Sequence, residues 1–144
     1  MARLRFVVAI APLLALACSA ERIPLAPDRA VLGGMDLHLT VALNRDFQCC
    51  VSDGSLQAVV VLTAPDSLMV PSGVTADSIS VVNGNATWTA ALGQLFRAPG
   101  YAEFVAREGP KWTIGASVDV YVVVHDGARR QLLEAARQQI TSSF

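Results

Sequence analysis

Alternation of apolar and polar residues dominates the chain after residue 35, and this pattern predicts β-strands. From Asp36 to Asn44 the odd positions are apolar and most even positions are polar, as in a strand that lays one face on a core. The alternation returns over residues 116–125, where an alanine and a series of valines share one face. Residues 56–63 (LQAVVVLT) are apolar on both faces in the middle of the run, which predicts a strand inside a sheet.

Two dipeptides that favour tight turns separate further strand-like runs. Asn83-Gly84 lies between residues 78–82 and 85–89, and Asp126-Gly127 follows the strand predicted over residues 116–125. Asn-Gly and Asp-Gly are typical of two-residue hairpin loops, because a type I′ turn needs two residues with positive φ. We therefore expect two antiparallel hairpins with type I′ turns, the second returning along the strand predicted over 116–125.

Two segments are ambiguous between helix and strand. Residues 101–108 (YAEFVARE) are rich in helix formers and predict either one short helix or an edge strand. Residues 129–140 place apolar residues at helical spacing, yet they follow a turn signal and a long strand. We favour a strand over residues 129–135 with the rest as a loose tail, and keep a short helix as the alternative.

Several short strands separated by turn signals, without strand–helix alternation, predict an all-β fold and specifically an antiparallel β-sandwich of about seven strands. The expected core filling consists of the valines with Phe47, Trp88, Phe96, Phe104 and Trp112.

The segment Gly109-Pro110-Lys111-Trp112, then Gly115, the alternation over residues 118–124 and Asp126-Gly127 resembles the immunoglobulin-like domains of bacterial envelope proteins. The resemblance implies an immunoglobulin-like fold and carries no activity.

Composition agrees with one compact domain plus extra segments. The chain has 144 residues, of which 53% are hydrophobic and 16% charged, with a mean hydropathy of +0.45. A disordered chain would be far more polar. The formal net charge of −1 offers no basic surface for nucleic acid.

The first residues carry a leader. Arg3 and Arg5 precede an apolar run from Phe6 to Ala17, which is long enough for a signal peptide and short of the roughly 20 residues of a spanning helix. The run ends in Leu-Ala-Leu-Ala-Cys, with small residues placed for cleavage before Cys18. This end resembles the lipobox of bacterial lipoproteins, although the position three before the cysteine is Ala15 where leucine is usual.

The lipoprotein resemblance implies a layout for the whole chain: a signal peptide over residues 1–17, lipidated Cys18 and a flexible tether over 18–34, and the β-sandwich over 35–144. Ser19 fits sorting to the outer membrane, facing the periplasm or the cell surface. Loss of Arg3 and Arg5 would leave a mature net charge of −3, since nine basic residues then oppose twelve acidic ones. The alternative is ordinary secretion with cleavage after Ala17 or Ala20.

Cys49 and Cys50 are the remaining cysteines. In an oxidising envelope they could form a strained and easily reduced vicinal disulfide, or grip a soft metal. The plain alternative is one buried and one exposed thiol, or pairing between chains. An adjacent pair does not by itself make a zinc site, which needs four ligands.

Polar-face residues of the predicted strands provide a candidate binding surface of Tyr101, Asp119, Tyr121 and His125. His38 and His125 would meet if their strands paired, and then Asp36 or Asp119 could join them on a metal. We favour solvent-facing histidines and ordinary cross-strand aromatics, and predict neither a metal nor a cofactor.

Sequence motifs for catalysis are missing. The chain has no His-Glu-x-x-His, no Gly-x-Ser-x-Gly, no Walker loop and no Gly-x-Gly-x-x-Gly. Ser52-Asp53-Gly54-Ser55 is typical of a turn. The sequence therefore predicts a non-catalytic, lipid-anchored protein that binds or scaffolds another envelope component, a protein or a glycan. The alternative is a small redox- or metal-responsive lipoprotein that acts through Cys49-Cys50.

Overall fold

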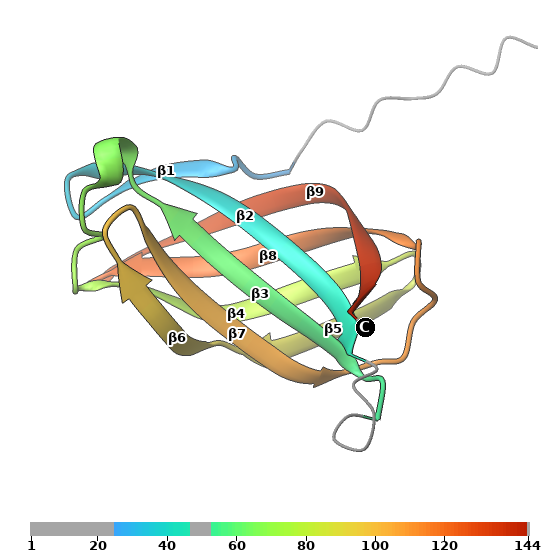
Figure 1. The fold of residues 1–144 in the computed structure, drawn as a ribbon. Coiled ribbons are helices and arrows are strands. Elements are labelled where there is room, and N and C mark those ends of the chain that lie inside the picture. The colour runs from blue at the N-terminus through green and yellow to red at the C-terminus, as the bar shows by residue number, and fades with distance from the viewer. Residues whose placement is uncertain (1–24, 47–52, 144) are drawn as a thin grey trace, which may run out of the picture.

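The computed structural model describes residues 25–46 and 53–143, and this part of the chain consists almost wholly of strands (Figure 1). In chain order the elements are β1 (Arg29–Leu32), β2 (Met35–Asp46), β3 (Leu56–Thr63), the short 3-10 helix η1 (Pro65–Ser67), β4 (Val74–Asn83), β5 (Ala86–Ala91), β6 (Gly93–Ala98), β7 (Tyr101–Gly109), β8 (Ser117–Asp126) and β9 (Arg129–Ser143).

The strands form one curled sheet in the order β5-β4-β8-β9-β2-β3-β7-β6, with β1 paired to the start of β2. Neighbours are antiparallel except β2 and β9, which pair in parallel over residues 43–46 and 140–143. The outermost strands, β5 and β6, are consecutive in the chain and are joined through Leu92. The sheet therefore curls until its halves face each other across the core, as Figure 1 shows.

Period-two patterning explains why these residues fill that core. On β8, Val118, Val120, Val122 and Val124 are all buried while the residues between them are partly exposed. β3 alternates in the same way. Burying each such aliphatic side chain contributes about 1.5–3 kcal/mol. The largest fully buried side chains are those of Phe104, Leu32, Leu37, Leu43, Leu56, Leu62, Ile79, Leu133, Ile140, Val60, Val70 and Val74.

The all-β prediction is confirmed, and so are both hairpins, but the turn type is different. Asn83 pairs with Ala86, so the central residues of the first turn are Gly84 and Asn85. Gly84 has a φ of +57° while Asn85 is outside the left-handed region, which is the pattern of a type II′ turn. The second turn has the same form, because Asp126 pairs with Arg129 and Gly127 has a φ of +56°.

Both segments that were ambiguous are strands, so the helical alternative at residues 101–108 and 129–140 is wrong. Residues 101–109 form β7, which lies between β3 and β6 and turns alternate side chains into the core. The expected loose tail after residue 135 is also wrong, because β9 continues to Ser143. A bulge, with Arg137 at φ +54°, shifts the register of β9 and hides its period from the sequence.

The fold begins earlier in the chain than predicted. Part of the segment expected to be a tether is β1, which forms a hairpin with β2 through Gly33 and Gly34, at φ +58° and +75°. Ahead of β1, Pro27 O accepts a hydrogen bond from Glu134 N at 2.9 Å, and Asp28 O accepts one from Leu39 N at 2.8 Å. These bonds attach residues 27–28 to both β9 and β2.

Three further expectations need correction. The sheet is mixed, because the β2–β9 pair is parallel, and the described residues alone form nine strands where about seven were expected. Among the predicted core aromatics, Phe104 is buried and Trp88 and Trp112 pack half-buried against the core, whereas Phe96 is 52% exposed. Phe47 lies outside the described residues.

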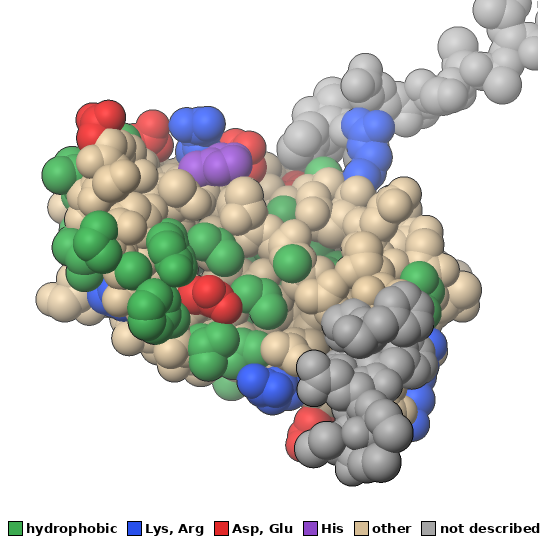
Figure 2. All heavy atoms as spheres, in the orientation of Figure 1, with side chains coloured by type: hydrophobic (Ala, Val, Ile, Leu, Met, Phe, Trp, Pro, Cys, Tyr) green, Lys and Arg blue, Asp and Glu red, His purple; other side chains and the backbone are tan. Residues whose placement is uncertain are grey.

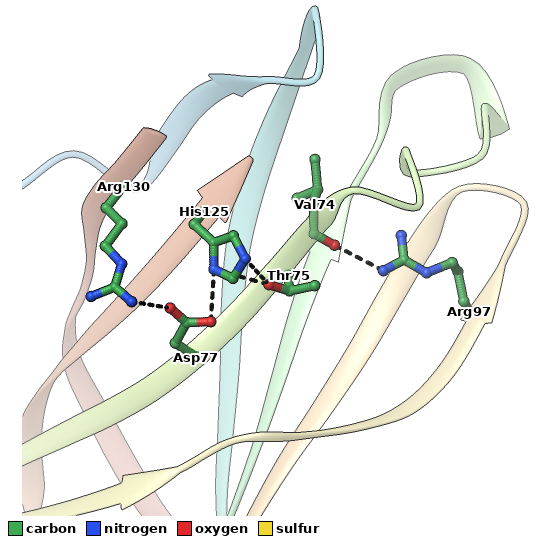
Figure 3. Close-up of polar contacts among 6 residues, drawn as sticks. All are labelled: Val74, Thr75, Asp77, Arg97, His125 and Arg130. Atoms are coloured by element: carbon green, nitrogen blue, oxygen red, sulfur yellow. Dashed lines mark hydrogen bonds and ion pairs between the residues drawn. The ribbon is translucent and has the colours of Figure 1, made fainter. Parts of the chain in front are cut away.

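Arg97 closes the curl where β6 approaches the start of β4. No ladder joins these strands among the described residues, and the guanidinium instead donates to Val70 O, Pro71 O and Val74 O at 2.8–2.9 Å; Figure 3 draws the bond to Val74. We call the place where Arg97 joins β6 to the start of β4 the β4–β6 seam. Beyond it, Trp88 of β5 packs on Gly109 of β7, where a Cβ would lie 2.9 Å from the indole ring.

We expect Arg97→Met to lower the free energy of unfolding by about 3 kcal/mol, because several carbonyl groups lose a charged donor while remaining partly buried. Urea unfolding measures the difference. Arg107→Met, at an exposed arginine near the end of β7, serves as the control and should change stability by no more than about 0.5 kcal/mol. Equal stability of the two variants would show that the seam does not depend on Arg97.

Candidate functional site

The predicted binding surface does not form one surface. Asp119, Tyr121 and His125 all lie on the outer face of β8, but Tyr101 lies on β7. Strands β9, β2 and β3 separate β8 from β7 in the sheet. Tyr101 therefore lies on a different part of the sheet from the other three residues.

His125 is the centre of a polar cluster that joins three strands (Figure 3). Its Nδ1 lies 2.7 Å from Asp77 Oδ1, and Asp77 Oδ2 lies 3.5 Å from an Arg130 guanidinium nitrogen. Thr75 and Arg130 are the cross-strand partners of His125 on either side. A register shift in β4 between Ala76 and Ser78 adds the residue that brings Asp77 beside the imidazole.

The geometry of this cluster suits strand cohesion better than catalysis. Thr75 Oγ1 is 3.0 Å from both ring nitrogens of His125. A hydroxyl activated by a histidine must instead be aligned on one nitrogen, with the carboxylate on the other. Asp77 and Arg130 were not predicted as partners of His125, since only strand pairing brings them together.

The two histidines are not neighbours, because β9 lies between β2 and β8. His38 instead pairs with Asp28, with 3.2 Å between Nε2 and Oδ2. Asp119 Oδ1 accepts a hydrogen bond from Arg137 N at 3.1 Å, which fixes the bulge of β9. Within residues 25–46 and 53–143, no group of three metal-ligating side chains occurs.

Tyr101 belongs to an exposed apolar surface at the β6–β7 turn. Its ring lies 6.0 Å from that of Phe96, and Met69 forms an isolated bridge with Pro99 in the turn. Leu68, Met69, Leu95 and Phe96 are each 50–52% exposed. We call these four side chains together with Tyr101 the β6–β7 patch.

Figure 2 shows green side chains gathered over this end of β3, β6 and β7. Beside the patch lies a shallow hollow of about 540 Å³, lined by Val61, Tyr101 and Glu103 among others. Contiguous apolar side chains on a surface rimmed by polar groups are typical of interaction sites. The sequence reveals little of this, because Phe96 was predicted to be buried and Leu68 and Met69 lie in a loop.

Cys18, Cys49 and Cys50 lie outside the described residues, so lipidation and the vicinal pair stay predictions. Within the part of the chain that the structure describes, no helix has the length and apolar character to cross a membrane. Comparison with family models, with curated proteins and with solved structures returned no match for this chain.

Asp53 forms the turn that leads into β3. Its Oδ1 accepts a hydrogen bond from Ser55 N at 2.9 Å, and its other oxygen lies 3.5 Å from Lys111 Nζ. Hydrogen bonds from the Ser55 side chain and backbone, and then the charge of Lys111, lower the pKa of Asp53 below its usual value. The carboxylate is exposed and serves the turn, which agrees with the prediction of a structural loop.

We expect Ser55→Ala to raise the pKa of Asp53 part of the way to its ordinary value, and Lys111→Met to raise it less. Because the folded pKa is the lower one, this contribution to stability is present above the unfolded pKa and is lost as the pH falls through the folded pKa. A carboxyl titration followed by NMR measures the shift. An unchanged pKa in Ser55→Ala would contradict the assignment.

Proposed function

We propose that this protein is a lipid-anchored, non-catalytic binding module of the bacterial envelope, and that the β6–β7 patch is the surface that holds its partner. The observation that carries the proposal is the exposure of Leu68, Met69, Leu95 and Phe96, with Met69 bridged to Pro99 in the β6–β7 turn and the Phe96 ring beside Tyr101. A folded domain of this size rarely leaves that many large apolar side chains together on its surface without a use for them. The immunoglobulin-like assignment of the fold stays a prediction.

Chemistry favours a protein over a glycan as the partner at this patch. Glycan sites need many hydrogen-bonding groups beside an aromatic ring, whereas the patch offers mainly leucine, methionine and phenylalanine side chains. Such side chains gain most from another apolar surface that removes them from water. A few large residues of this kind commonly supply most of the affinity of an interface.

A short connection to the membrane supports the same function. From Cys18 to Leu25 the chain advances seven residues, which at about 3.5 Å each reach no further than about 25 Å. Leu25 and Ala26 are already attached to the body, because both backbone N–H groups donate to Glu134 Oε2. A lipid on Cys18 would therefore keep the body next to the bilayer, where an envelope partner is concentrated.

The anchor is tested by metabolic labelling with a fatty acid in a bacterial host. We expect the wild-type chain to take up label and Cys18→Ala to lose it, because the diacylglycerol is attached to the thiol of the lipobox cysteine. Cys49→Ala keeps a cysteine at residue 18 and should remain labelled. A wild-type chain without label would refute the lipid anchor while leaving the binding surface open to its own test.

The patch is tested by replacing two of its side chains. We expect the double variant Leu68→Ser with Phe96→Ser to lose partner binding by more than about tenfold, since two large contacts are removed from the interface. Binding is measured by capture from solubilised envelopes followed by titration of the captured partner. Leu132→Ser is the matched control, because Leu132 is 47% exposed on β9, away from the patch. Equal loss in the control, or no loss in the double variant, would refute the proposal.

A further inference from the structure

The edge of β2 that faces β9 is open over a short stretch. β1 pairs along this edge with residues 35–38, and β9 pairs along it with residues 43–46, while β3 occupies the opposite edge. Between the two pairings, the described residues supply only one bond to this edge, from Leu39 N to Asp28 O. On the edge of β9 that faces β2, Glu134 N donates to Pro27 O, and the pairing of β9 with β2 begins only at Ile140. We call this opening the β2–β9 gap.

The β2–β9 gap contains a cavity of about 690 Å³. Its walls come from residues 26–28, from residues 38–41 of β2, and from residues 134–138 of β9. Leu39 and Ala135 contribute apolar surface, and Thr40 and Gln138 contribute hydrogen-bonding side chains. The cavity therefore combines strand edges that are only partly paired with an apolar surface and a few polar groups; on β9, Ala136 O accepts a hydrogen bond from Gln138 Nε2 at 2.9 Å.

Glu134 is the buried charged residue of this cavity, with only 3% of its surface exposed. Its Oε2 accepts the hydrogen bonds from Leu25 N and Ala26 N. Its Oε1 is enclosed and has no hydrogen-bond partner among the described residues. A buried carboxylate oxygen without a donor is unfavourable, so a positively charged donor brought into the gap would be strongly held.

The other charged group of the cavity wall also favours a positively charged ligand. Asp28 adds a second carboxylate to the cavity wall, and the nearby His38 is already paired with it at 3.2 Å. Among the described residues that line the cavity there is no lysine or arginine. A basic occupant would therefore meet complementary charge, whereas an acidic occupant would be repelled.

We propose that the β2–β9 gap binds an extended polypeptide segment that carries a basic side chain. The backbone of the segment pairs with the groups of β2 that lie between Leu39 N and the β9 ladder, as in recognition by strand addition. The basic side chain donates to Glu134 Oε1. The open stretch from Leu39 to Leu43 spans about 13 Å at about 3.3 Å per residue, which accommodates about four residues of extended chain. The site is separate from the β6–β7 patch and does not depend on it.

The test uses the full chain and a fluorescent peptide of alternating lysine and valine, with a second peptide in which glutamate replaces lysine. We expect the lysine peptide to bind and the glutamate peptide to bind at least about tenfold more weakly. Glu134→Gln should weaken the lysine peptide by about tenfold or more, because the carboxylate charge is lost. Glu103→Gln removes the same charge from β7 beside the patch and should leave the affinity unchanged.

A second variant and a second measurement locate the peptide. Ala136→Trp places a large side chain in the cavity wall while keeping the carboxylate of Glu134, and should also abolish binding. Hydrogen exchange of the wild-type chain should show new protection at Val41 and Ala136 when the peptide is bound. Leu39 N and Glu134 N already point to this side of their strands, and the direction of the N–H groups alternates along each strand. These measurements decide the matter even if Glu134→Gln fails to fold.

Several results would overturn the inference. Binding that falls equally in Glu103→Gln and Glu134→Gln would mean general attraction to an acidic body. Protection confined to β6 and β7 would move the peptide to the β6–β7 patch. If butylamine displaced the fluorescent peptide at the same concentration as the unlabelled peptide does, the site would bind a small amine without strand addition. Absence of binding to the wild-type chain would also refute the inference, and none of these results changes the outcome expected for the Leu68 and Phe96 variants.

Discussion

Every backbone N–H and C=O group that a curled sheet removes from water must find a partner, and this requirement governs two places among the described residues where neighbouring strands are not joined by a ladder. At the β4–β6 seam, Arg97 donates to the carbonyl groups of Val70, Pro71 and Val74. At the β2–β9 gap, Glu134 accepts from the N–H groups of Leu25 and Ala26. One charged side chain of each sign thus replaces part of a strand, because charged groups make the stronger hydrogen bonds to the main chain.

The two interruptions differ in how completely they are filled. Arg97 reaches several carbonyl oxygens as well as Gln94 Oε1, so the seam is closed by the protein itself. Glu134 retains an enclosed oxygen without a partner among the described residues, next to a cavity of about 690 Å³. The closed junction belongs to stability, and the incompletely filled one is where a ligand gains most from binding.

Irregular positions in the strands also decide where polar side chains gather. The register shift in β4 brings Asp77 to His125, and the bulge in β9 brings Arg137 N to Asp119. The regular parts of the same strands are occupied by valine and leucine facing the core. In a regular strand only every second residue points outward. A bulge adds one residue on the outer face, and this extra residue is what brings Asp77 and Arg137 to their partners.

The sequence by itself determined the all-β class and the buried valine face of β8 through alternation, the strand over residues 56–63 through its apolar run, and the positions of both hairpins through the Asn-Gly and Asp-Gly dipeptides, because these depend on residues close in sequence. Tertiary structure alone decided the parallel pairing of β2 with β9, the strand character of residues 101–108 and 136–143, and the inclusion of residues 27–34 in the sheet. It also decided the partners of His125, the exposure of Phe96 and the isolation of Glu134. Each of these depends on which strand lies beside which, and a pattern of period two is the same for every choice of neighbour.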